Sequence, residues 1–167
     1  MKASDSEKKA AAEIKLKLVA QFGHFAADGA ADTVSSTLIL ETRHWLDEFP
    51  GAKSLYDDAL QKHKNGVFTR NALDDLRLSL ETLLKTLFSN EKSLENQVPL
   101  IGAFIKERKG SPELANMIQK LVDYFSKYQN TYIKHNDAVL NAEVDVILEL
   151  TSSLMKHLVQ LRGQGES

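Results

Sequence analysis

The chain has 167 residues, of which 43% are hydrophobic and 26% are charged, and its formal net charge is −2. This composition is typical of a single globular domain, and the small net charge argues against a protein that binds DNA over its whole surface. The absence of cysteine excludes disulfides, thiolate metal sites and cysteine nucleophiles. No apolar run has the length of a transmembrane helix, and the first twelve residues lack the pattern of a secretory signal. We therefore expect a cytoplasmic protein with no membrane partner.

Apolar residues recur at helical spacing along the chain, and no alternating β-branched run interrupts them. The pattern predicts an all-α fold, a helical bundle. The first predicted helix covers 5–28 and ends at Gly29, because glycine is a common helix stop. The second predicted helix begins with Asp32 or Thr33 as its N-cap, since both side chains can accept a hydrogen bond from an unpaired backbone N–H.

The second helix is predicted to end at Pro50, since proline cannot continue a helix. We expect its aromatic residues Trp45 and Phe49 to pin it onto the core of the bundle. The third predicted helix covers 52–64 and is closed by the turn pair Asn65-Gly66.

The fourth predicted helix, over 70–88, has the clearest amphipathic pattern in the chain. Its apolar residues fall on one face at a spacing of 3.6 residues, and charged residues occupy the other side. The apolar face consists of Leu73, Leu76, Leu80, Leu83, Leu84, Leu87 and Phe88. A loop over 89–97 follows this helix.

Proline and glycine signals define the next two predicted helices. Pro99 suits the first turn of the fifth helix, which is predicted to end at Gly110. Ser111 is a predicted N-cap for the sixth helix, with proline next to it at the first helical position. The sixth helix is predicted to continue to Tyr132 or beyond, and Asn136-Asp137 is predicted to form a turn.

The last predicted helix, over 141–162, is apolar around a wide arc. One neighbouring helix does not usually cover such an arc, so the pattern predicts either a central position in the bundle or the surface of a homodimer. The domain organisation predicted from these elements is an N-terminal helical extension over 1–50, a helical domain over 51–162 and a frayed tail over 163–167.

The end of the sixth helix carries the densest group of chemically capable side chains, over 129–137. Asn130 and Lys134 are four residues apart and share one helix face. His135 lies near the flank of the apolar stripe, where partial burial can bring its titration close to neutral pH. It is then suited to general acid–base catalysis, and Lys134 to stabilising a phosphate. The alternative is an ordinary helix end, because the positive charges of Lys and His are stabilised by the helix dipole at the C-terminus.

A second charged group lies on the fourth helix. Arg77, Glu81 and Lys85 follow one another at a spacing of four residues. They are candidates for lining an RNA-binding groove, Arg77 above all, since it lies nearest the apolar face. The alternative, which the spacing favours, is a ladder of intrahelical ion pairs on a solvated face.

Three residues near the end of the sixth helix, Lys127, Tyr128 and Tyr132, are further candidates for RNA contacts. Tyrosines at a spacing of four residues can stack on nucleotide bases. The more common alternative is an aromatic stripe at the edge of the core, with its hydroxyl groups reaching water.

Three sequence features together resemble a known family. They are the run RLSLETLLK at 77–85, the loop KSLENQ at 92–97 and the run YQNTYIKHND at 128–137, which precedes the long apolar last helix. The stretch over 55–161 resembles a HEPN domain (higher eukaryotes and prokaryotes nucleotide-binding). Its Lys-His-Asn-Asp variant is similar to proteins of bacterial abortive infection and phage defence.

The resemblance implies a ribonuclease of a bacterial defence or toxin–antitoxin setting. HEPN nucleases are metal-independent endoribonucleases whose active site forms across a twofold homodimer, so no metal or other cofactor is implied. The family motif is an arginine, a polar residue and, several residues later, a histidine. The histidine matches His135 and the polar residue matches Asn130, with Lys134 and Gln129 as further catalytic candidates.

The position of the family's arginine is occupied by Gln129. Glutamine can donate a hydrogen bond to a phosphate but does not neutralise its charge. Two interpretations therefore stay open for the site. One is an RNA-directed protein that cleaves RNA with His135, and the other is a catalytically silent helical module that binds or regulates a protein partner, such as an antitoxin or a nucleotidyltransferase.

Overall fold

The computed structural model describes residues 34–66, 69–135 and 141–163, and it describes their side chains except at positions 69, 129–135, 141 and 142. The chain divides into two units, Met1–Ser36 and Thr37–Ser167. All described helices lie in the second unit, apart from the first residue of one helix. The predicted helix before residue 30 and the predicted N-caps at 32 and 33 lie outside the described residues. The predicted division into an extension, a helical domain and a tail stays a prediction.

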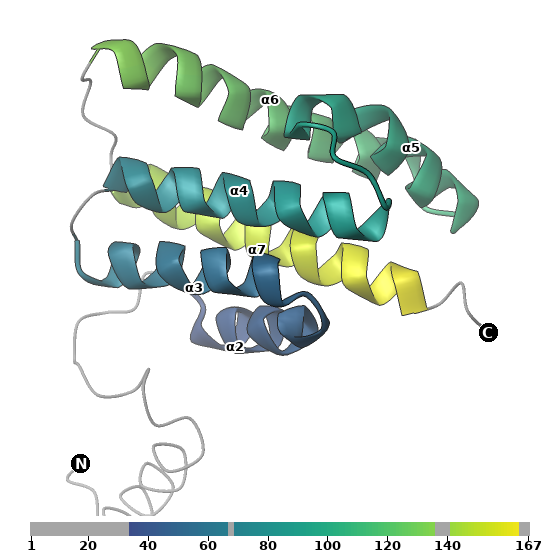
Figure 1. Cartoon of the computed structure of the whole chain (residues 1–167), viewed down its shortest axis with the longest axis horizontal. Helices are drawn as coiled ribbons and strands as arrows, with labels where there is room; N and C mark the ends of the chain where they lie inside the picture. Colours follow the sequence, from purple (N-terminus) through teal and green to yellow (C-terminus); the bar gives the residue numbers. More distant parts are fainter. Residues whose placement is uncertain (1–33, 67–68, 136–140, 164–167) are drawn as a thin grey trace, which may run out of the picture. The chain divides into compact units, whose positions relative to one another are not determined.

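All regular elements in the described part of the chain are helices, which confirms the predicted all-α helical bundle (Figure 1). It consists of α2 (Ser36–Trp45), η1 (Leu46–Glu48), α3 (Pro50–Lys64), α4 (Thr69–Leu87), η2 (Leu94–Gln97), α5 (Val98–Glu107), α6 (Pro112–His135) and α7 (Asn141–Gly163), where η marks a short 3₁₀ helix.

The corner between α2 and α3 differs from the prediction. The α2 helix ends at Trp45 and is followed by the 3₁₀ turn η1, closed by the hydrogen bond from Phe49 N–H to Leu46 C=O at 2.9 Å. Pro50 does not end α2 but opens α3. Proline fits the first turn of a helix because its missing N–H would have no intrahelical acceptor there. The same signal therefore marked a helix start rather than a helix end.

The two aromatic residues at this corner also behave differently from each other. Phe49 is buried, as predicted, whereas Trp45 is 38% exposed. The buried face of this corner is made of Ile39, Thr42, Leu46 and Phe49, and Trp45 lies beside that face. The prediction that Trp45 pins the helix onto the core is therefore wrong, because the tight turn of η1 gives the inward position to Leu46.

The core is formed around the apolar face of α4. Its residues Leu73, Leu76, Leu80, Leu83 and Leu84 are all buried, as their spacing predicts. The helix packs against both α3 and α7 (Figure 1). Direct contacts between α3 and α7 complete this group, since His63 Nε2 lies 3.0 Å from Asp145 Oδ1.

The last helix, α7, buries most of its wide apolar arc inside the chain. Its buried apolar residues are Val144, Ile147, Leu148, Leu154, Met155, Leu158, Val159 and Leu161. This is the central position that the sequence offered as one alternative. Two apolar residues of the helix, Val146 and Leu150, stay exposed.

Polar side chains inside the core are satisfied by a small network of hydroxyl groups. The Ser152 hydroxyl donates to Leu148 C=O at 2.6 Å, so the 2.6 Å contact between Tyr56 and Ser152 has the Tyr56 hydroxyl as its donor. The Thr42 hydroxyl lies 3.2 Å from Ser152 C=O. Tyr56 and Ser152 come from α3 and α7, and burial raises the pKa of Tyr56 to about 12. The network therefore connects α2, α3 and α7 at one level of the core.

The boundary between α5 and α6 follows the predicted signals. The α5 helix ends at Glu107, and Gly110 N–H then donates to Ile105 C=O at 2.9 Å. A Cβ atom at Gly110 would lie 2.5 Å from the Ile105 side chain, so this close turn requires glycine. Ser111 caps α6 as predicted, because its hydroxyl accepts the N–H of Leu114 at 3.2 Å.

We predict that Tyr56→Phe lowers the free energy of unfolding by about 1 kcal/mol at neutral pH, because it removes one buried hydrogen bond. The folded-state pKa of Tyr56 is raised from 10.0 to about 12, so its contribution is complete below pH 10 and is lost as the pH rises toward 12. Urea unfolding followed by circular dichroism at pH 7, 10 and 11 should show the difference between wild type and variant narrowing above pH 10. A constant difference across this range would contradict the assignment.

Candidate functional site

The predicted catalytic cluster lies on the last turns of α6. The helix continues without interruption to His135, so Asn130 and Lys134 are one helical turn apart along it. The side chains of Gln129, Asn130, Lys134 and His135 lie outside the described ones, and so does that of Tyr132. The turn predicted after His135 is also outside the described residues. The roles of these residues therefore stay predictions.

Lys127 and Tyr128, the candidates for RNA contact that precede this cluster on α6, differ in their burial. Lys127 is exposed, whereas Tyr128 is buried. The ring of Tyr128 stacks on that of Tyr124, with centroids 6.0 Å apart and planes at 21°. The Tyr124 hydroxyl donates to Glu143 Oε1 at 2.8 Å and so connects α6 with the first turn of α7. The two rings lie at the edge of the core, as the alternative expects, but the Tyr128 hydroxyl is buried rather than in contact with water. A role of Tyr128 in stacking on a base stays a prediction.

The charged residues of α4 form a continuous ladder. Arg77 Nη1 lies 3.0 Å from Glu81 Oε2, and Lys85 Nζ lies 2.9 Å from Glu81 Oε1. Arg77 Nε also lies 3.2 Å from Asp74 Oδ1. The hydrogen bond to Glu81 raises the pKa of Lys85 above its usual value. The geometry is that of the ion-pair ladder, the alternative that the spacing favours.

Glu81 also fixes the segment that follows α4. Its Oε2 atom accepts the backbone N–H of Leu94, the first residue of η2, at 3.2 Å. Its side chain is only 13% exposed. Because a carboxylate can accept several hydrogen bonds, one half-buried group holds two cations and a backbone amide. The ladder therefore fixes the position of η2 against α4 and does more than pair charges on the surface.

The segment over 92–97, one of the segments that carry the family resemblance, contains η2 and is held by a pair of amide side chains, Asn90 and Gln97. Gln97 is fully buried. Its Nε2 atom donates to Asn90 Oδ1 at 2.8 Å and to Lys92 C=O at 3.0 Å, and Asn90 Nδ2 donates to Gln97 Oε1 at 3.2 Å. This reciprocal bonding gives the loop one defined conformation. The amide oxygen and nitrogen of Asn90 bond those of Gln97, so this pair stabilises the fold of the loop.

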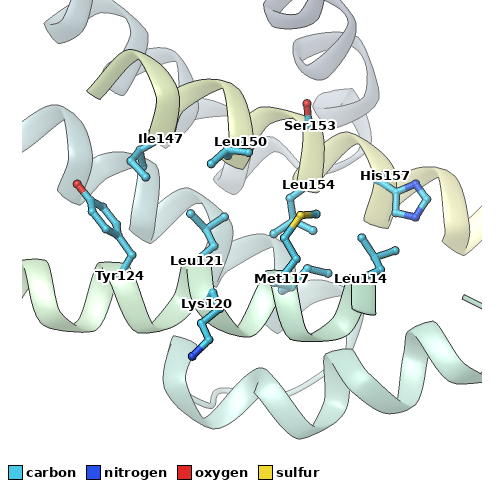
Figure 2. Close-up of a pocket in the computed structure, with 11 residues that line it drawn as sticks. Leu114, Met117, Lys120, Leu121, Tyr124, Ile147, Leu150, Ser153, Leu154 and His157 are labelled. Carbon is cyan, nitrogen blue, oxygen red and sulfur yellow. The ribbon is translucent and has the colours of Figure 1, made fainter. Parts of the chain in front are cut away.

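An apolar groove lies between α6 and α7, with a volume of about 480 Å³ (Figure 2). It exists because α6 packs against α5 and α7 packs against α4, while α6 and α7 make little direct backbone contact in the described part. Side chains from both helices form its walls, among them Leu114, Met117, Leu121, Ile147, Leu150 and Leu154.

The sequence contained a signal for this groove but not its location. Leu114, Met117 and Leu121 recur at helical spacing near the start of α6. Such a stripe is most often buried against a neighbouring helix. Only the packing shows that Met117 is 56% exposed and that the stripe faces an open groove.

Metal binding was not expected from the sequence. Within the residues that the structure describes, no group of three or more His, Asp or Glu side chains is arranged to hold an ion. None of the described helices combines the length and the apolar character needed to cross a bilayer.

Comparisons with known proteins do not assign this chain to a family. No family model, no curated protein and no solved structure matches it. The resemblance to HEPN domains therefore stays a hypothesis that rests on the sequence features given above.

We predict that Glu81→Gln lowers the free energy of unfolding by about 1–3 kcal/mol, because it weakens hydrogen bonds to two cations and one backbone amide. The matched control is Glu91→Gln. The carboxylate of Glu91 is 93% exposed, and its Oε2 atom lies 3.9 Å from Lys85 Nζ. That change should stay within about 0.5 kcal/mol. Urea unfolding compares the two variants, and equal losses would show that the buried position of Glu81 has no special importance.

Proposed function

We propose that this protein is a HEPN-like, RNA-directed protein of a bacterial defence or toxin–antitoxin system, acting in the cytoplasm as a metal-independent endoribonuclease. The observation that supports it most is the position of the 129–135 cluster on the uninterrupted end of α6. A rigid helix can hold a histidine, a lysine and two amides at fixed spacing, as acid–base chemistry on a phosphodiester requires.

The proposed reaction is cleavage by the ribose 2′-OH. His135 removes the proton of the 2′-OH, whose oxygen attacks the adjacent phosphorus. The bond from phosphorus to the 5′-oxygen then breaks, and a proton is delivered to that leaving oxygen by His135 or by its counterpart in a second copy of the chain. The products carry a 2′,3′-cyclic phosphate and a 5′-OH. Lys134 and the amides of Gln129 and Asn130 hold the phosphate during this step.

The paired cations of α4 limit which residues hold the RNA in this proposal. Arg77 and Lys85 each have a carboxylate partner in the ladder, so their charge is already compensated. Lys127 is exposed and lies on α6 close to the proposed site. We therefore assign the main electrostatic contact with RNA to Lys127 and to the end of α6, with Arg77 and Lys85 acting through the fold.

A second candidate function is a catalytically silent helical module that binds a protein partner, such as an antitoxin or a nucleotidyltransferase. Gln129 at the arginine position favours it, because glutamine does not neutralise a phosphate. The compensated charges of the α4 ladder favour it as well, since they leave fewer cations for RNA. In this case His135 has no role in chemistry and its replacement leaves binding intact.

RNA cleavage by the full chain in EDTA, with the ends of the products identified, tests the proposal. His135→Ala should lower the cleavage rate by about 100-fold or more, since it removes the general acid–base group. Gln129→Arg should raise the rate, because it adds a bidentate phosphate ligand. His44→Ala is the matched control, since His44 is an exposed histidine on α2, far along the chain from the cluster, and should leave the rate unchanged.

The result that would overturn the nuclease is equally specific. Absence of cleavage by both the wild type and Gln129→Arg, with both proteins folded by circular dichroism, would exclude it and leave the silent module. Cleavage that neither His44→Ala nor His135→Ala reduces would point to a contaminating nuclease.

A further inference from the structure

The turn between α3 and α4 carries positive charge and lacks acidic residues. Over 59–73 the sequence has three cations, Lys62, Lys64 and Arg70, and no Asp or Glu. Lys64 and Arg70 are exposed, and so is Gly66, which lies between them in the sequence. A Cβ atom at Gly66 would meet nothing within 4 Å, so no other part of the chain covers the turn at this point. The surface is therefore open to a large partner.

The acidic residues close to this turn already have cationic partners. Asp75 forms an ion pair with Lys62. Asp74 is four residues after Arg70, but its Oδ1 atom lies 3.2 Å from Arg77 Nε. Within the part of the chain that the structure describes, no carboxylate forms an ion pair with either exposed cation of the turn. Their charge is therefore uncompensated, in contrast to that of the α4 ladder.

Two contacts of α7 place this turn at the same end of the bundle as the proposed reaction site. His63, near the end of α3, has its Nε2 atom 3.0 Å from Asp145 Oδ1 in α7. Two residues earlier in α7, Glu143 Oε1 accepts a hydrogen bond from the Tyr124 hydroxyl of α6. The end of α3, the start of α4, the end of α6 and the start of α7 all lie on the left of the view in Figure 1. One extended strand that passes the end of α6 can therefore also contact the turn.

The uncompensated charge favours a polyanion as the partner. Single-stranded RNA carries one phosphate per nucleotide, and its contacts with Lys and Arg release bound counterions, which gives affinity without sequence preference. Lys64 offers a compact ammonium group, and Arg70 offers a guanidinium that can bind a phosphate through two parallel hydrogen bonds. Both cations are thus suited to holding phosphates, and neither has to leave an intramolecular ion pair to do so.

We propose that the α3–α4 turn is a second RNA-binding surface, on which Lys64 and Arg70 contact phosphates of the strand whose reacting phosphate lies at the end of α6. The inference rests on the proposed RNA-directed function and adds the path of the RNA outside the reaction site. It uses no catalytic side chain, so it applies equally to a protein that binds RNA without cleaving it.

Fluorescence anisotropy of a labelled, single-stranded 2′-O-methyl RNA with the full chain in EDTA tests the proposal. The methyl group blocks attack by the 2′-oxygen, so binding is measured apart from cleavage. Lys64→Gln combined with Arg70→Gln should weaken binding about tenfold at 0.1 M salt. The slope of log K against log salt concentration should become shallower by about 1.4, since each lost phosphate contact on a single strand contributes about 0.7. Lys64→Arg combined with Arg70→Lys keeps both charges and should retain most of the binding.

The matched control is Lys106→Gln combined with Lys109→Gln, which removes the same charge from two exposed lysines at the end of α5. They lie toward the opposite end of the bundle, because Arg108 Nε donates to Leu161 C=O, near the end of α7, at 2.8 Å. Salt of 0.1 M screens charges that are more than about 10 Å apart. The control should therefore bind the RNA almost as tightly as the wild type.

The possible failures are distinguishable. Equal losses in the two double glutamine variants would overturn the proposal and leave the RNA-directed function standing, whereas no binding of the RNA by the wild type would overturn both. Tighter binding of poly-L-glutamate than of the RNA would overturn it in favour of an acidic protein partner. RNA binding that is lost specifically with Lys64 and Arg70, without any cleavage of unmodified RNA, would support the surface while excluding the nuclease.

Discussion

The fold depends on the burial of one helix face, the leucine face of α4. Leu80, Leu83 and Leu84 are completely removed from solvent, and each buried leucine side chain contributes about 1.5–3 kcal/mol. Because α4 packs against both α3 and α7, this face brings together helices that are far apart in the sequence. The contacts that bridge α3 and α7, between Tyr56 and Ser152 and between His63 and Asp145, form only because α4 holds the two helices side by side.

The same packing decides which surfaces stay open. Since α7 turns its main apolar arc toward α4, it offers α6 only a part of that arc. The α6 helix packs instead against α5, and the space between α6 and α7 becomes the apolar groove with His157 at one end. Whereas some apolar surface stays open, the charged residues of the α4 ladder are paired with one another. Arg77 and Lys85 are used within the fold by Glu81, which also ties down η2. We assign chemistry to the polar residues at the end of α6.

Much of the architecture was predictable from local signals. The spacing of the α4 leucines, the cap at Ser111, the turn at Asn65-Gly66 and the course of α6 and α7 all follow from helical periodicity and from the conformational limits of proline and glycine. Pro50 opens α3 and does not end α2, and the sequence alone does not separate these two cases because proline can stop one helix and start the next. Trp45 was expected in the core, but the 3₁₀ turn η1 gives that place to Leu46.

The sequence by itself determined the all-α class, the buried face of α4 and the group of catalytic candidates on α6, since these depend on residues close together along one helix. The ladder spacing of Arg77, Glu81 and Lys85 was local too, but only the tertiary structure added Leu94 to it. The amide pair of Asn90 and Gln97, the hydroxyl network around Ser152 and the groove between α6 and α7 were decided by packing alone. The physical reason is that periodicity tells which face of a helix is apolar, whereas the distance to the neighbouring helix determines whether that face is covered.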